Sequence, residues 1–168
     1  GLAESADEAR LLVQATKYPP MGRRGVGFCR ANQYGLNLES YVARANEDVL
    51  VGVQIEDLQG VEKIDEILAV PGIDAVFIGP YDLSASLGIT AQFDHPDYLR
   101  ARDQVLEACR RHGVAAGIHV VPPDPGQVIA RLREGYRMIA YSLDITMLLN
   151  ASRTGLTEIR DAAASLGL

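Results

Sequence analysis

The chain has 168 residues, 48% of them hydrophobic, and carries a formal net charge of -6 with a pI near 5.0. This size supports one ordinary core, so we expect a single domain over residues 1–168. The acidic balance argues against nucleic acid as a partner, because phosphate binding needs a basic face. There is no apolar run of membrane-spanning length and no signal-peptide pattern, so we expect no membrane partner. Cys29 and Cys109 are far apart, which predicts two free thiols and a cytoplasmic protein.

Short apolar segments rich in β-branched residues alternate with helical patterns. Ser5 and Glu8 form a capping-box pattern, which predicts the start of a first helix. The predicted strands cover 49–56 (VLVGVQIE), 74–79 (DAVFIG), 115–121 (AAGIHVV) and 138–142 (MIAYS). Because each is followed by a helical pattern, we expect βαβ units and a parallel sheet.

Start and stop signals bound the helices between these strands. Apolar residues at helical spacing predict a helix within 58–68. Pro96 and Gly113 mark the two ends of the next helix, and Gly135 closes another that opens at Asp124. The last predicted helices cover 145–151 and 156–168.

Two architectures contain such units, namely an open doubly wound sheet and a (β/α)₈ TIM barrel. A barrel typically needs about 250 residues, so this chain is short by roughly 80, or three to four units. Residues 1–4 read as the end of a strand or loop that already leads into a helix. A truncated barrel is therefore compatible with the pattern, beside the open sheet.

Two carboxylates follow consecutive predicted strands, Glu56 at the end of VQIE and Asp82 within GPYDLS. Strand alternation places Gln54 and Glu56 on the face opposite the apolar residues, and His119 follows the same rule on the third strand. In a barrel that face points to the carboxyl-terminal mouth, where the chemistry lies. Neighbouring strands are about 4.8 Å apart, so two acids there repel unless they share a proton or bind a cation. The residue types favour a hard cation, Mg²⁺ or Mn²⁺.

Plainer roles stand beside these interpretations. Either acid taken alone can be a helix N-cap or a solvated loop residue, and His119 can be a hydrogen-bonded wall residue. Arg23 and Arg24 lie in the Pro- and Gly-rich loop 18–27, where they either are surface charges or bind an anionic substrate. The glycines of GRRGVG do not follow a strand of a βαβ unit, so a dinucleotide site is not favoured.

The motifs YPPMGRRGVG (18–27), VQIE (53–56) and AVPGIDAVFIGPYDLSASLG (69–88) resemble the HpcH/HpaI family of class II pyruvate aldolases. The resemblance extends over nearly the whole chain. It implies an α/β fold, a (β/α)₈ TIM barrel of which this chain holds the C-terminal half, strands five to eight, plus a C-terminal helix. It also implies a homo-oligomer that acts on a small 2-oxo acid and an aldehyde.

The resemblance assigns the metal site. Glu56 and Asp82 match the two metal-binding carboxylates, and Asp82 also belongs to the substrate-binding turn. The expected cofactor is a divalent cation, Mg²⁺ or Mn²⁺, with Co²⁺ as a third option. No segment matches the family's base histidine or its enolate-stabilising arginine, so both are expected in a missing N-terminal part and the catalytic residues stay unassigned.

The resemblance also assigns substrate contacts. Gln54 matches the glutamine that contacts the oxo acid. Tyr81 stands where alanine is common and is expected to contact the substrate carboxylate through its backbone, while Gly79 and Pro80 shape that turn. His119 stands where many members have an apolar residue, so it and Arg24 are candidate pocket residues.

These roles imply metal-dependent cleavage of a 4-hydroxy-2-oxo acid to pyruvate and an aldehyde, through a metal-stabilised enolate. No lysine Schiff base is needed for this chemistry. The alternative function is a catalytically incomplete half barrel that serves as a metal-binding or assembly module.

Overall fold

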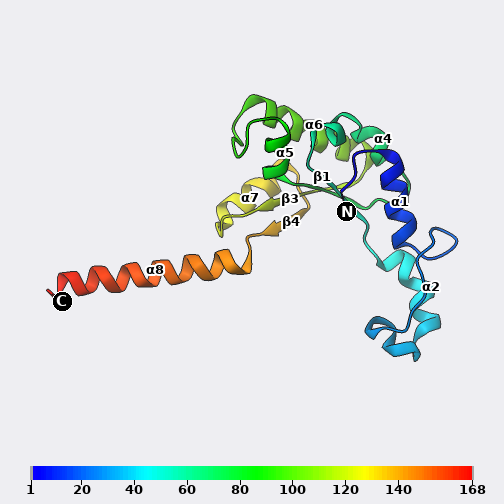
Figure 1. Cartoon of the computed structure of the whole chain (residues 1–168), viewed down its shortest axis with the longest axis horizontal. Coiled ribbons are helices and arrows are strands. Elements are labelled where there is room, and N and C mark those ends of the chain that lie inside the picture. Colours follow the sequence, from blue (N-terminus) through cyan, green and yellow to red (C-terminus); the bar gives the residue numbers. More distant parts are fainter. Residues whose placement is uncertain (1, 168) are drawn as a thin grey trace.

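Four parallel strands form the sheet, and they follow one another in space in the same order as in the sequence. The computed structural model describes residues 2–167 (Figure 1). Its strands are β1 (Gly52–Ile55), β2 (Ala75–Ile78), β3 (Ala115–Val120) and β4 (Met138–Tyr141). The parallel sheet that the sequence predicts is confirmed, and its order shows no reversal of the kind that defines a doubly wound sheet.

The free edge of β1 carries the first described residues. Leu2 forms a parallel bridge with Gln54, and the Ala3 N–H donates to the Gln54 carbonyl at 3.2 Å. Leu2 and Ala3 therefore extend the sheet beyond β1 and lead into the first helix, in agreement with the strand end predicted there.

The helices are α1 (Ala6–Thr16), α2 (Leu38–Asp48), α3 (Leu58–Glu62), α4 (Ile64–Leu68), α5 (Pro80–Ser86), α6 (Pro96–His112), α7 (Pro125–Glu134) and α8 (Asp144–Ser165), with the 3₁₀ segment η1 (Arg30–Gly35) before α2. Helices α1 and α2 precede the first strand, and the other helices come after strands along the chain. Helix α4 packs against both α1 and α6, and α7 packs against β3 and β4. Apolar residues of α1, α3, α4, α5 and α6 meet one face of the sheet, where the core lies.

Strand alternation decides what each face of the sheet presents. Val53 and Ile55 are fully buried beneath the helices, whereas Gln54 and Glu56 are half-buried on the other side. His119 on β3 is half-buried in the same way, between the buried Ile118 and Val120. The predicted division into an apolar helix-facing side and a polar side is therefore confirmed.

Several predicted boundaries were wrong. The segment 58–68 is two short helices, because Lys63 leaves helical geometry with φ -99° and ψ 14°. The helices expected at 145–151 and 156–168 are one helix, α8, of 22 residues. No sequence pattern predicted η1 or α2. Ser5 caps α1 by accepting from the Glu8 N–H, but the Glu8 carboxylate bonds to the Glu4 N–H, so the capping box is incomplete.

Two elements extend from the body of the molecule (Figure 1). One is the arm formed by η1 and α2, and the other is α8, in which no residue is buried. The arm is tied down by Lys17, whose buried ammonium donates to the carbonyls of Asn46 (2.7 Å) and Val49 (2.6 Å). Within residues 2–167, no helix is long and apolar enough to cross a membrane.

Candidate functional site

Glu56 and Gln54 form the centre of the site at the carboxyl end of β1. They stand two residues apart, so their side chains leave the same side of the strand. The Gln54 amide donates to the Glu56 carboxylate. Both side chains are half-buried, which restrains Glu56 while leaving it open to the polar side of the sheet.

Gly79 stands directly against this pair from the neighbouring strand. Ile55 pairs with Ile78 in the sheet register, and the Gly79 N–H donates to the Ile55 carbonyl at 3.2 Å. A Cβ at position 79 would lie 2.7 Å from Oε2 and 3.0 Å from Cβ of Glu56. A side chain at position 79 would therefore force the Glu56 side chain to shift.

Asp82 lies in the first turn of α5, the helix that follows β2. Pro80 opens that helix and Gly79 is its N-cap residue. A carboxylate in a first turn is favoured by the partial positive charge of the helix start. The Asp82 side chain is exposed and makes no hydrogen bond or ion pair with another described residue. It is therefore free to bind a cation.

The side chains available as ligands limit the kind of metal site that can form here. Within the part of the chain that the structure describes, no group of three or more His, Cys, Asp and Glu side chains could hold a metal ion. A cation here would have Glu56 and Asp82 as protein ligands and would take its remaining ligands from water or substrate oxygens. Hard cations such as Mg²⁺ tolerate such a set, because they bind through one or two carboxylates and keep several waters.

Pro80, Tyr81 and His119 come together at the carboxyl ends of β2 and β3. All three line one cavity of about 190 Å³, which Gln54, Glu56 and Asp82 do not line. The Tyr81 ring packs edge-on against Phe93, with centroids 5.0 Å apart. The Nε2–H of His119 donates to the Ser142 carbonyl at 3.1 Å, so this ring is a hydrogen-bonded wall residue.

Arg24 is not brought to this site. Its guanidinium lies 4.8 Å from the centroid of the Tyr18 ring and donates to the Tyr41 hydroxyl. Tyr18 follows the end of α1, next to Lys17, which binds the carbonyl of Val49 just before β1. Arg24 therefore lies near the amino end of the sheet, whereas the carboxylates lie near its carboxyl end.

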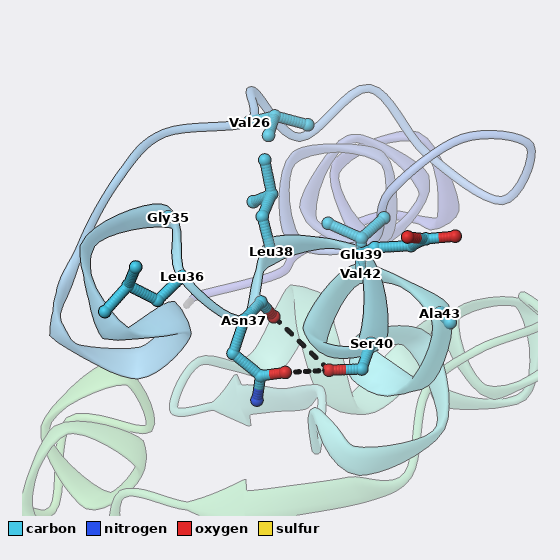
Figure 2. A pocket seen from close by; sticks show the side chains of 9 residues that line it. All are labelled: Val26, Gly35, Leu36, Asn37, Leu38, Glu39, Ser40, Val42 and Ala43. Atoms are coloured by element: carbon cyan, nitrogen blue, oxygen red, sulfur yellow. Dashed lines mark hydrogen bonds between the residues drawn. The ribbon is translucent and has the colours of Figure 1, made fainter.

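An open groove lies on the arm, between η1, α2 and the loop at Val26 (Figure 2). Its volume is about 1130 Å³, and its only titratable side chain is Glu39. The Ser40 hydroxyl bonds to Asn37 within it. Leu36 is 91% exposed at its rim. Its lining contains no cluster of acid–base or metal-binding side chains, and no sequence motif indicates it.

The chain belongs to the HpcH/HpaI aldolase/citrate lyase family, whose model matches residues 2–151. It is 42% identical over 155 residues to the hydroxypyruvate/pyruvate aldolase of Roseobacter denitrificans. The aligned region covers 91% of this chain and 59% of that protein. It is 43% identical over 149 residues to the 2-keto-3-deoxy-L-rhamnonate aldolase of Klebsiella pneumoniae, over 88% of this chain and 54% of that protein.

Structural comparison agrees with the sequence match. A crystal structure of a family protein from Burkholderia cenocepacia has a TM-score of 0.86 at 40% identity, over 94% of this chain and 62% of that chain. The resemblance predicted from the motifs is thus confirmed at the level of the family. The chain spans a little over half the length of the two aldolases, 59% and 54%.

Proposed function

We propose that the protein containing this chain is a metal-dependent aldolase that cleaves a 4-hydroxy-2-oxo acid to pyruvate and an aldehyde. The main support for the proposal is the position of Glu56. It lies against Gly79 and is hydrogen-bonded to Gln54, where the adjacent strands β1 and β2 end. The names of the two similar aldolases support the reaction class. The expected compartment is the cytoplasm, since Cys29 and Cys109 are both free thiols.

The architectural part of the proposal is that this chain forms half of a TIM barrel, strands five to eight. Three features support it. The strand order is sequential, Leu2 adds a further parallel position beside β1, and the face away from the helices carries half-buried polar residues. A closed barrel would cover that face and place Glu56 in its mouth.

In this mechanism the chain's own residues hold and orient the substrate. Glu56 and Asp82 would hold a divalent cation, which when bound supplies Lewis-acid polarisation of the 2-oxo acid. Gln54 fixes the Glu56 carboxylate through one N–H and keeps a second N–H and its carbonyl oxygen for the substrate. The backbone around Tyr81 would contact the substrate carboxylate. The base and the enolate-stabilising arginine would come from the rest of the protein.

The test uses the complete protein and several 4-hydroxy-2-oxo acids, with pyruvate release coupled to lactate dehydrogenase. Exchange of pyruvate methyl protons in D₂O is followed in parallel, because it needs no choice of aldehyde. EDTA should stop both reactions and added Mg²⁺ or Mn²⁺ should restore them. Glu56→Gln should lose both, whereas Glu66→Gln, an exposed acid on α4, should keep both. Metal binding without either reaction would rule out the aldolase.

A second candidate is an assembly module, favoured by the exposed apolar side chains of α8. They include Ile145, Leu148, Leu149 and Ile159. Apolar surface of this kind usually marks an interaction site, and it also supports the expected homo-oligomer. Light scattering distinguishes the cases, because a stable monomer of 18.2 kDa would exclude obligate assembly of this chain.

A further inference from the structure

A cavity of about 190 Å³ lies between α6 and α7, on the helix-covered side of β3. Tyr98, Leu99 and Arg102 line it from α6, and Gln127 and Arg131 line it from α7. At its base are Ile118 and Val120, whose side chains belong to the face of β3 that the helices cover. The lining does not include Gln54, Glu56 or Asp82, so the cavity is distinct from the polar pair at the end of β1, although His119 of the polar face also lines it.

The charge of its lining favours an anion. Arg102 and Arg131 contribute two guanidinium groups, while Asp94 is the only carboxylate among the lining residues and is exposed. The acids that pair with the arginines, Asp103 and Glu134, are not part of the lining. An anion entering the cavity would thus meet two guanidinium groups and one carboxylate in the lining itself, while Asp103 and Glu134, outside the lining, offset part of the positive charge.

Both guanidinium groups keep unused donors. Arg102 bonds to one oxygen of Asp103 through Nε (2.9 Å) and Nη2 (2.7 Å), and Arg131 bonds to Glu134 through Nη1 at 2.6 Å. A guanidinium has five N–H donors in a rigid plane, so several remain on each. Their side chains are only 16% and 29% exposed, so they are held in place rather than free in solvent.

A buried hydroxyl close to the two arginines has no partner. Tyr136 is 0% exposed, and its hydroxyl makes no hydrogen bond within the described residues. Burial raises the pKa of Tyr136, and the charges of Arg102 and Arg131 act on the same hydroxyl. Tyr98, whose pKa is also raised by burial, completes this group. Tyr136 itself does not line the cavity, but its hydroxyl interacts electrostatically with three residues that do, namely Tyr98, Arg102 and Arg131.

The remaining lining residues indicate the chemical character and size of the ligand that the cavity could bind. Tyr81 and Phe93 contribute aromatic rings, and Leu99 and Val121 contribute aliphatic side chains. An engineered cavity of about 150 Å³ accommodates benzene, so 190 Å³ leaves room for a ring or short chain bearing one carboxylate. Larger, drug-sized ligands need cavities of about 300 Å³ or more.

We propose that the α6–α7 cavity is a second ligand site that binds a small carboxylic acid with a flat apolar body, its carboxylate on Arg102 and Arg131. The site is independent of Glu56 and Asp82. Pro80 and Tyr81 of its lining belong to the turn that the aldolase proposal uses, and His119 is the candidate pocket residue on β3. A ligand here would therefore contact the wall of the turn without occupying the metal site.

The experiment titrates the chain with benzoate and follows backbone amide shifts by ¹H–¹⁵N correlation spectra, with EDTA present to remove metal. Saturable shifts should appear around residues 98–102 and 127–131. Benzamide, the neutral isostere, should bind at least about tenfold more weakly, as expected from the loss of one charge-assisted hydrogen bond. Pyruvate with Mg²⁺ serves as the comparison for the strand-end site.

Variants of one helix supply the matched control. Arg131→Gln should weaken benzoate binding about tenfold, whereas Arg133→Gln, an exposed arginine of α7 outside the lining, should leave it unchanged. Arg102→Gln tests the other guanidinium, and the spectra themselves report whether each variant is folded. The proposal fails if benzoate gives no saturable shifts up to about 20 mM. It fails equally if the shifts centre on residues 54–56 and 79–82, or persist unchanged in both arginine variants. Loss of aldolase activity alone would not affect it.

Discussion

Gly79 leaves room for the Glu56 carboxylate at the end of β1. A Cβ at position 79 would lie 2.7 Å from Glu56 Oε2 and 3.5 Å from the Gln54 amide nitrogen. Contacts below 3 Å with a carboxylate oxygen are too close for a carbon atom, so the glycine and the acid are sterically coupled. The turn into α5 and the candidate metal ligand therefore depend on one another.

Gly79→Ala should displace Glu56 without unfolding the chain. We expect Mn²⁺ affinity, measured by calorimetry, to fall at least about tenfold, or 1.4 kcal/mol. The matched control is Gly25→Ala, since a Cβ at position 25 has nothing within 4 Å. Equal Mn²⁺ affinity in Gly79→Ala and the unmodified chain would contradict the role of Glu56 as a ligand.

The strands and the polar pair could be predicted because short-range pattern decides them. Period-two alternation marks β1 and a continuous apolar run marks β2, and alternation alone places Gln54 beside Glu56. The close approach of Gly79 to Glu56 depends on the register between two strands, which no local pattern contains. The family resemblance therefore predicts Gly79 as a turn residue but gives no steric reason for it.

The structure of the arm and the position of Arg24 could not be predicted from local sequence patterns. Helix α2 is held by Lys17 through contacts 29 and 32 residues away in sequence, and it has few buried residues to mark a helical stripe. Arg24 was considered for the pocket because of its charge, but it packs on Tyr18 near the opposite end of the sheet. Both outcomes depend on long-range packing rather than on propensity.

The two thiols should differ in reactivity and in their effect on stability. Cys29 is exposed, whereas burial raises the pKa of the Cys109 thiol from 9.0 to about 11. Ellman's reagent at pH 8 should therefore modify one thiol rapidly and the other only on unfolding. Cys29→Ser should remove the fast phase and Cys109→Ala the slow one. Two fast thiols would show that Cys109 is not buried in solution.

The raised pKa of Cys109 also predicts a loss of folding stability at alkaline pH. Because the folded state holds Cys109 neutral to a higher pH, its contribution is full below pH 9 and is lost as the pH rises toward 11. Urea unfolding at intervals over this range should show a stability decline that is smaller in Cys109→Ala. An identical decline in both proteins would assign it to other groups.

Asp65 should contribute to stability at neutral pH and lose that contribution in acid. A hydrogen bond from Arg111, assisted by His112, holds the pKa of Asp65 below its usual 3.8. The contribution is therefore present above pH 3.8 and disappears as the pH falls through the lower folded-state value. The group is exposed, so Asp65→Asn should cost less than about 1 kcal/mol at pH 7. The cost, measured by urea unfolding, should vanish near pH 2; a cost independent of pH would contradict the ion pair.

Tyr136→Phe should stabilise the chain, because the hydroxyl it removes is buried and has no partner among residues 2–167. An unsatisfied buried polar group costs about 1–3 kcal/mol, of which we expect about 1 kcal/mol to be recovered. Thermal or urea unfolding measures the change, with Tyr98→Phe as the control on the cavity wall. A loss of stability in Tyr136→Phe would show that the hydroxyl does form a hydrogen bond in solution.

Lys17→Met should loosen the arm and lower the stability of the whole chain. The Lys17 side chain is 3% exposed, and its ammonium donates to Asn46 and Val49, at the end of α2 and just before β1. Carbonyls at a helix end have no partner within the helix, and a cation there also meets the negative end of the helix dipole. Hydrogen bonds to charged groups contribute about 1.5–3 kcal/mol each.

We therefore expect Lys17→Met to lower the free energy of unfolding by about 3 kcal/mol, since methionine retains the apolar stem but leaves both carbonyls unpaired. Amide hydrogen exchange should accelerate first across α2, because that helix loses its anchor while the sheet keeps its core. The control is Lys63→Met, which alters the chain's other lysine at the half-exposed junction of α3 and α4. If both variants lose the same stability, or if exchange accelerates equally in the sheet and in α2, Lys17 does not hold the arm.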